Sequence, residues 1–348
     1  MPILSAFTSL PEFLALAGLM GSARDPFTES GTAAELAPHV ARGLRADGTV
    51  RLPLYFGPPR DEVFLSFHFR GTTLTMPLGF ELVQIRDAVN DRDLFRLTFV
   101  NGTTQSRYLQ LEIHDGTGWT DLGITTEPLN RNDLTRFDLH VRLDAADGVF
   151  ALAMNGTTAL SWTGDSLRTP GTKLDSIDTK VWSNSANITC IVSAVIAADE
   201  DTRPMQMVQL TPDAAGHYAE MAGTLVAVTG TSTTTATIQA SHAIADAPNR
   251  RNTYTTPGLP APFETGHVPL QLQIALMAQR GDAPGSAIRA MIRSTGPGPA
   301  IDSFGATEAL DTDWGCVLSV FATDPDGDQP WTVDVINALE IGMQSRAL

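Results

Sequence analysis

The chain has 348 residues, of which 43% are hydrophobic and 18% are charged, and its formal net charge is −16 at pH 7. This length is sufficient for two or three domains, each with a hydrophobic core of its own. A nucleic acid or an anionic membrane surface needs a clustered basic face on its protein partner, so the acidic balance argues against both.

The first 60 residues contain an apolar run from Phe13 to Met20, and the first basic residue, Arg24, follows it. A signal peptide carries its positive charge before the apolar run, and a membrane span needs about 20 apolar residues, so we expect neither. Ser9 and Pro11 suit the start of a short N-terminal helix that ends near Gly21. Residues 1–55 are interpreted as an attachment and oligomerisation segment, with 22–60 irregular.

Alternating apolar and polar residues then predict a series of strands at the spacing of a β-sandwich. Three pairs, Asn101-Gly102, Asp147-Gly148 and Asn155-Gly156, tolerate positive φ and predict tight hairpins. The sequence therefore predicts an antiparallel sandwich domain over residues 56–203. Its expected strands are 63–69, 94–100, 108–114, 136–143, 149–154, 159–162 and 190–198.

Residues 204–265 are rich in Thr, Ser, Ala, Gly and Pro and are interpreted as a linker with connecting strands, including weak strands at 224–237. Strand patterns return at 268–279, 286–294 and 315–323. Residues 333–343 predict one helical turn followed by a returning edge strand. Residues 266–348 are therefore expected to form a second, C-terminal β-sandwich domain, which makes the whole chain all-β.

Motifs for catalysis are missing from the sequence. The sequence lacks the Glu-x-Asp-x-x-Glu pattern that one large group of glycoside hydrolases with a sandwich fold carries on a single strand. Glu112 and Asp115 fall on opposite strand faces and are expected to be solvated. No nucleophile elbow, phosphate-binding loop or dinucleotide-binding turn is present. Cys190 and Cys316 lie in different predicted domains, which favours buried free thiols. The sequence thus favours a protein that is not an enzyme.

One loop resembles a cation site. Asp324, Asp326 and Asp328 supply oxygens at alternate positions around Gly327, as a calcium loop does, but Val335 stands where the distal Glu belongs. A turn explains the same residues, so the expectation is no cofactor, with calcium as the weaker alternative. The seven histidines occur singly, which argues against zinc.

Aromatic residues provide the remaining binding chemistry. A tryptophan within a strand is usually part of the core, whereas Trp119 follows the loop Asp115-Gly-Thr-Gly118 between two strands. Exposed aromatic faces stack on sugars. Trp119, with His114 and Asp115, is therefore the candidate glycan-binding site.

Four segments resemble a known family. The run from Leu134 to Asp165, followed by Val195 to Arg203, resembles the concanavalin A-like (laminin G-like) domain, a jelly roll, of virion proteins from tailed phages and gene transfer agents. The segments 323–332 and 335–342 resemble the terminal domain of the same proteins. Residues 1–55 and 240–265 match nothing in that family.

The resemblance implies a non-enzymatic structural protein on the surface of a phage particle. It would be a tail fibre, tail-tip or spike component with a lectin-like module for a host surface polysaccharide, other virion proteins as partners, and a homotrimeric state. Decoration of the head or tail is an alternative within this class. A free carbohydrate-binding protein or glycoside hydrolase is the alternative outside it.

Overall fold

The computed structural model describes residues 3–7, 27–30, 43–46, 49–71, 78–87, 92–103, 106–167, 171–182, 190–223, 243–261, 263, 266–281, 286–294, 299–312 and 314–348. Within these, side chains are described from residue 58 onward, apart from 175 and 177–191. The predicted N-terminal helix and the weak strands at 224–237 lie outside the described residues. The chain divides into two compact units, each described here by itself. Unit 1 comprises Met1–Ala17 and Asp25–Met207, and unit 2 comprises Gly18–Arg24 and Val208–Leu348.

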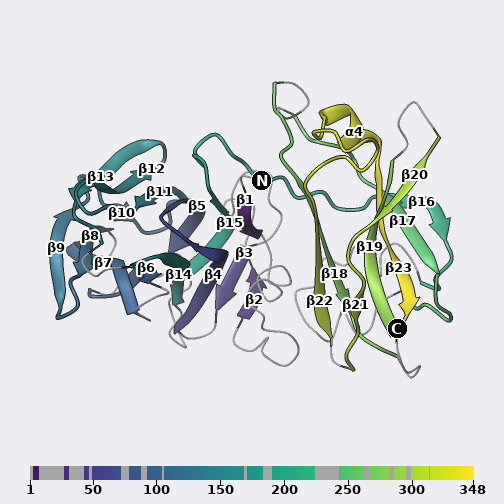
Figure 1. The fold of residues 1–348 in the computed structure, drawn as a ribbon, viewed down its shortest axis with the longest axis horizontal. Helices are drawn as coiled ribbons and strands as arrows, with labels where there is room; N and C mark the ends of the chain where they lie inside the picture. The colour runs from purple at the N-terminus through teal and green to yellow at the C-terminus, as the bar shows by residue number, and fades with distance from the viewer. Residues whose placement is uncertain are drawn as a thin grey trace. The chain divides into compact units, whose positions relative to one another are not determined.

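Unit 1 contains two antiparallel sheets (Figure 1). Sheet A has the strand order β13-β12-β11-β5-β15-β3-β2, and β1 also pairs with β15. Sheet B has the order β10-β8-β7-β6-β14-β4, and β9 pairs with β8. The strands of sheet A are β1 (Ile3–Phe7), β2 (Phe27–Ser30), β3 (Gly43–Ala46), β5 (Glu62–Gly71), β11 (Thr135–Arg142), β12 (Gly148–Met154), β13 (Thr157–Gly164) and β15 (Cys190–Ala198). Those of sheet B are β4 (Thr49–Arg60), β6 (Glu81–Asp87), β7 (Arg92–Thr103), β8 (Ser106–His114), β9 (Trp119–Ile124), β10 (Leu129–Asn130) and β14 (Leu174–Trp182).

One hydrophobic core lies between these two sheets. Phe95 of sheet B contacts Phe150 of sheet A, with ring centroids 5.5 Å apart, and Phe67 stacks on Phe137 at 5.0 Å. All four side chains are at most 1% exposed. Burying a phenylalanine side chain contributes about 1.5–3 kcal/mol. The predicted antiparallel sandwich is therefore confirmed for unit 1.

The hairpin turns agree with the sequence only in part. Asn155 and Gly156 both adopt positive φ and join β12 to β13, as predicted. Asn101 and Gly102 also have positive φ, but they form a bulge within β7 ahead of its last pair, Thr103 with Ser106. The prediction of a tight turn at Asp147-Gly148 is wrong. Gly148 is instead the first residue of β12, and the longer loop is shaped by Asp144, whose carboxylate accepts hydrogen bonds from the amides of Ala146 and Asp147.

Unit 2 contains a larger and a smaller antiparallel sheet. Sheet C has the order β16-β17-β23-β19-β20, with β21 also on β19, and a two-stranded sheet pairs β18 with β22. Its elements are β16 (Ala214–Ala219), β17 (Arg251–Thr255), β18 (Leu272–Ala278), β19 (Ser286–Ser294), β20 (Ile301–Phe304), β21 (Glu308–Ala309), β22 (Gly315–Phe321), α4 (Val333–Ala338) and β23 (Glu340–Ala347).

The core of unit 2 joins the two sheets and helix α4. Ile274 of β18, Ile292 of β19 and Ile336 of α4 belong to one buried cluster around Trp331, which is 2% exposed. The indole of Trp331 donates a hydrogen bond to the Phe321 carbonyl at 2.8 Å. Thr332 caps α4 by accepting from the amide of Val335. The second β-sandwich predicted at the C-terminus is thus present, and its sheet C also includes β16 and β17 from the segment 204–265.

Three further expectations are decided by the described residues. The segment 22–60 is not irregular throughout, because it contains β2, β3 and β4. The predicted helical turn is α4, but β23 lies in the middle of sheet C between β17 and β19, so its placement at an edge was wrong. Cys316 is a buried free thiol. Among the described helices, none has the length and apolar character of a membrane span.

Candidate functional site

A row of polar side chains crosses the face of sheet B that points away from the core. Along β8, Leu109, Leu111 and Ile113 are buried in the core while the alternate residues face outward. Strand pairing places Gln84 opposite Arg96, Arg96 opposite Glu112, and Glu112 opposite Asp121. Four strands, β6 to β9, thus contribute one residue each to this row.

Arg96 is the centre of the row. Its Nε and Nη2 donate to the two carboxylate oxygens of Glu112 at 2.7 and 2.9 Å, and its Nη1 donates to Glu81 at 2.9 Å. Partial burial works against its charge, but the hydrogen bonds and charges of Glu112 and Glu81 outweigh burial and hold the pKa of Arg96 above its usual range. Thr98 donates a further hydrogen bond to Glu112 at 3.2 Å. The expectation of a solvated Glu112 was therefore wrong.

Gln84 extends the network beneath the surface. It is 2% exposed, and its amide nitrogen donates to Glu81 at 2.9 Å and to Asp93 at 3.1 Å. Its amide oxygen has no hydrogen-bond partner in the described part of the chain. A buried acceptor without a partner costs free energy, so this oxygen lowers the stability of the network and is not an exposed binding group.

The predicted residues Trp119 and His114 lie together beside Arg96. The guanidinium of Arg96 stands 4.1 Å from the centre of the Trp119 ring, and the ring of His114 packs edge-on against it at 5.1 Å. The indole is half-buried. Trp119 is thus held in place by two neighbours rather than projecting freely.

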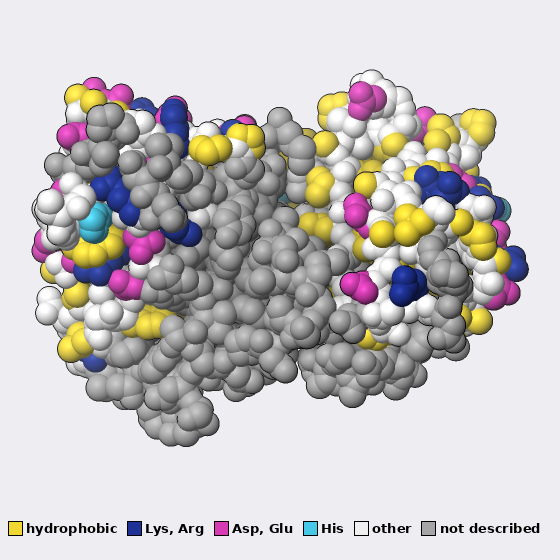
Figure 2. All heavy atoms as spheres, turned by 60° about the horizontal axis from the view of Figure 1, so that its bottom comes forward, with side chains coloured by type: hydrophobic (Ala, Val, Ile, Leu, Met, Phe, Trp, Pro, Cys, Tyr) yellow, Lys and Arg dark blue, Asp and Glu magenta, His cyan; other side chains and the backbone are white. Residues whose placement is uncertain are grey.

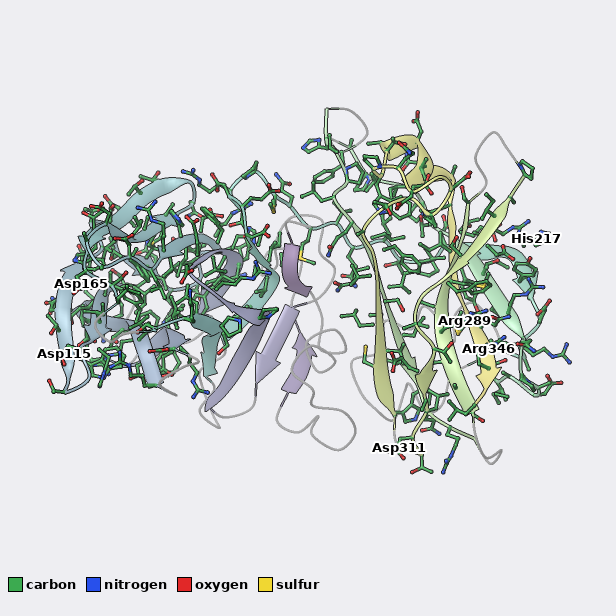
Figure 3. The ribbon with its side chains drawn as sticks, in the orientation of Figure 1. Asp115, Asp165, His217, Arg289, Asp311 and Arg346 are labelled. Carbon is green, nitrogen blue, oxygen red and sulfur yellow. The ribbon has the colours of Figure 1, made fainter. Side chains whose placement is uncertain are left out.

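Asp115, the third predicted residue, shapes the loop that carries Trp119 (Figure 3). One of its carboxylate oxygens accepts hydrogen bonds from the amide and the hydroxyl of Thr117, both at 2.8 Å, and from the amide of Gly118 at 2.9 Å. The bonds from Thr117, with that from Gly118, lower the pKa of Asp115 to about 2. Because this oxygen is engaged in the turn, Asp115 positions β9 relative to β8.

The aspartates of the possible calcium loop lie in unit 2, in a tight turn after β22. The carboxylate of Asp324 accepts from the amide of Asp326, and that of Asp328 accepts from the hydroxyl of Thr323. Within the described residues, no group of three or more His, Cys, Asp or Glu side chains is arranged to hold a metal ion. The contacts seen here are those of a turn.

The sequence does not predict that Arg96 and Glu112, the central pair of the site, contact each other. Each belongs to an alternating strand, which is a usable signal for an outward-facing residue. Their pairing depends on the register of β7 against β8, and no local motif carries that information. Elsewhere in unit 1, Asp201 and Arg203 form an ion pair.

Comparisons with known proteins show resemblance in fold alone. No family model matches the chain, and no curated protein matches it. Among solved structures, an endo-β-1,4-glucuronan lyase from Trichoderma reesei aligns at 12% identity and a TM-score of 0.40, covering 52% of this chain and 91% of that one. The globular domain of calreticulin from T. cruzi aligns at 12% identity and 0.38, covering 52% and 83%.

The galectin LEC-6 of Caenorhabditis elegans aligns at 12% identity and a TM-score of 0.31, covering 42% of this chain and 90% of that one. Lectins and polysaccharide lyases are thus both among the structures similar to this chain. TM-scores this low do not distinguish between the two activities. The functional argument accordingly rests on the residues of this chain.

Proposed function

We propose that unit 1 is a carbohydrate-binding module whose ligand lies on the outer face of sheet B, across Trp119 and Arg96. The observation that carries this proposal is the row of polar side chains fixed by mutual hydrogen bonds next to an aromatic ring. A sugar presents hydroxyl groups along its edges and C–H groups on its faces, so it is recognised by polar groups held in place beside an aromatic surface.

Binding without catalysis is the form of this function that the charges favour. Glycoside hydrolysis uses two carboxyl groups, one of which must be able to donate a proton. Glu112 and Glu81 are instead both bonded to the Arg96 guanidinium. An arginine that holds two carboxylates by charge-assisted hydrogen bonds favours a binding face over an acid–base pair.

The test is a glycan array of bacterial surface polysaccharides, probed with the full chain and two variants. Trp119→Ala and Arg96→Met should each weaken binding at least about tenfold, because each removes part of the face. Arg142→Met is the matched control, since Arg142 lies on sheet A and its side chain bonds to the Asp147 carbonyl. Binding that survives both variants, or no binding by the wild type, would refute the proposal, and unsaturated sugar ends among the products would identify a lyase.

We further propose that the protein is displayed on a phage particle as a tail fibre, tail-tip or spike component. The support is the resemblance of residues 134–165, 195–203 and 323–342 to virion proteins, together with the two successive β-sandwich units. Other virion proteins and a host surface polysaccharide would be its partners, and a homotrimer the expected state.

Cryo-electron microscopy of particles released by the producing strain tests this location. Symmetric copies at the tail tip or along a fibre are the expected result, and copies on the head lattice would indicate decoration instead. Particles lacking this chain would contradict the virion proposal and leave a free lectin. Light scattering that gives a monomer at micromolar concentration would contradict the trimer.

A further inference from the structure

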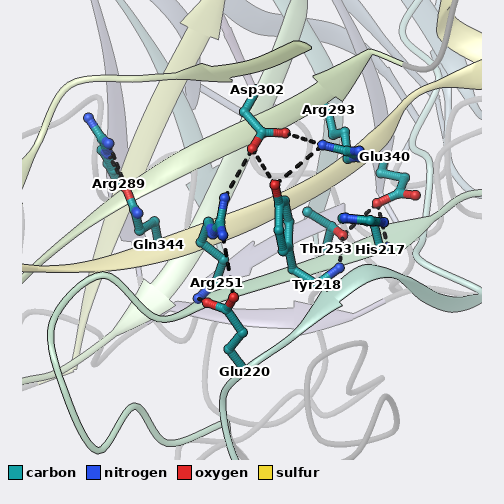
Figure 4. Close-up of polar contacts among 10 residues, drawn as sticks. All are labelled: His217, Tyr218, Glu220, Arg251, Thr253, Arg289, Arg293, Asp302, Glu340 and Gln344. Carbon is teal, nitrogen blue, oxygen red and sulfur yellow. Dashed lines mark hydrogen bonds and ion pairs between the residues drawn. The ribbon is translucent and has the colours of Figure 1, made fainter. Parts of the chain in front are cut away.

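The outer face of sheet C carries arginines in two different electrostatic states. Arg251 and Arg293 both bond to Asp302, at 3.1 and 2.7 Å, and the hydroxyl of Tyr218 donates to the same carboxylate at 2.6 Å (Figure 4). Glu220 adds a second acid to Arg251. These two guanidinium groups are therefore neutralised within the chain.

Arg289, on the same face, bonds to a neutral group. Its Nε and Nη2 both donate to the amide oxygen of Gln344, at 2.8 and 2.5 Å (Figure 4). Its guanidinium also lies 3.7 Å from the centre of the Phe304 ring. No carboxylate of the described residues pairs with it. The side chain is thus fixed from two sides, and no carboxylate in the described part of the chain compensates its charge.

Arg346 is the neighbour of Arg289 on the adjacent strand. Arg289 pairs with Gln344 and Ala287 pairs with Arg346, so the two arginines are diagonal neighbours on one face of β19 and β23 (Figure 3). Arg346 also bonds to a neutral group, the Asn249 amide oxygen, at 2.5 Å. Burial, with the charge of Arg346, holds the pKa of Arg289 below its usual range.

Two adjacent cations that pair with no carboxylate of the described ranges are unusual in a chain with 39 acidic and 23 basic residues. On the face shown in Figure 2, acidic and basic side chains of the described residues are interspersed. A guanidinium has five N–H donors, of which Arg289 uses two and Arg346 one in the contacts above. The remaining donors suit the planar or tetrahedral oxygens of an anion.

We propose that Arg289 and Arg346 form a binding site for one oxyanion group, a carboxylate, sulfate or phosphate. Gln344, Asn249 and Phe304 hold the two side chains in place, so little conformational entropy is lost on binding. This site lies in unit 2 and does not depend on the carbohydrate face of unit 1.

Isothermal titration of the full chain with sodium sulfate, sodium phosphate and sodium acetate, at ionic strength matched with sodium chloride, tests the site. Binding of at least one of the three is expected, and their order of affinity identifies the anion source. Arg289→Gln and Arg346→Gln should each weaken that binding about tenfold, because each removes charge-assisted hydrogen bonds. Arg289→Lys should retain part of it, since it keeps the charge but loses the planar fork.

Arg250→Gln is the matched control, because its side chain belongs to the same unit but is paired with Asp246. It removes the same charge and should change the affinity less than about twofold. Circular dichroism of all four variants verifies that they are folded. The proposal is overturned if the wild type binds none of the anions above the chloride background, or if Arg250→Gln weakens binding as much as the other two.

Discussion

Arg96 and Glu112 face each other directly across β7 and β8 and share two hydrogen bonds, of 2.7 and 2.9 Å. The side chains are 22% and 14% exposed, so solvent screens the pair only in part. A double-mutant cycle with Arg96→Met and Glu112→Gln should give a coupling energy of about 1–2 kcal/mol in urea unfolding. A coupling near zero would mean that the network contributes nothing to rigidity.

His68 should make unit 1 less stable in mild acid. Burial, with the charge of Arg136, lowers its pKa from 6.5 to about 4, so the unfolded chain binds a proton in a range where the folded chain does not. The contribution is fully present above pH 6.5 and is lost as the pH falls towards 4, by up to about 3 kcal/mol. Urea unfolding across this range should show a weaker pH dependence for His68→Gln than for the wild type.

At the Asn155-Gly156 turn, the energetic cost of a left-handed backbone can be measured separately from side-chain packing. Gly156 has a φ of +80°, and an added Cβ would meet no atom within 4 Å. Gly156→Ala should therefore destabilise unit 1 by about 1–2 kcal/mol through the left-handed backbone alone. Gly118→Ala, equally open but without a positive φ, is the control and should cost less. Equal losses in thermal unfolding would disprove this account.

At Gly342, by contrast, the structure leaves no space for a side chain. A Cβ at this position would lie 2.0 Å from the Asn252 carbonyl oxygen, inside the pairing of β23 with β17. Gly342→Ala should destabilise unit 2 by at least about 3 kcal/mol, because backbone must shift in the middle of a sheet. Calorimetry should show a lower unfolding temperature for unit 2 and an unchanged one for unit 1. Gly281→Ala should change neither temperature, because a Cβ added at Gly281 would meet no atom within 4 Å.

Tyr218 provides a spectroscopic probe of the cluster on sheet C. Its hydrogen bond to Asp302 is the main cause that raises the pKa of its phenol above 10. In Asp302→Asn the anionic acceptor is gone while Arg251 and Arg293 remain, so the phenol pKa should fall below that of the wild type. An NMR titration of labelled tyrosine follows this change. An unchanged pKa would show that Asp302 does not control Tyr218.

Local patterns in the sequence predict the structural features that depend only on residues adjacent in the chain. The alternation along β8 and the Asn155-Gly156 turn are visible in the sequence because strand faces and positive φ are properties of a few adjacent positions. The place of Trp119 after a glycine-containing loop makes it a candidate binding residue, and the structure places it next to His114 and Arg96.

The structural features that the sequence does not predict are those that depend on the order of the strands within a sheet. Pro53, Pro58 and Pro59 indicate an irregular segment, yet all three lie in β4. Proline is tolerated there because β4 is the last strand of sheet B and pairs on one side only, with β14. In the same way, the interior place of β23 and the pairing of Arg96 with Glu112 follow from contacts between distant segments.

The positions of β14 and β15 determine when unit 1 can form during synthesis. β14 joins β4 to β6 in sheet B, and β15 joins β5 to β3 in sheet A, although both are the last strands of the unit to be made. Until translation has passed residue 198, a nascent chain therefore leaves β4 without its partner strand and leaves β5 and β6 each with one unpaired side. Folding of unit 1 should consequently be late and slow compared with that of a helical domain, and the ribosome-bound chain is a natural client for chaperones.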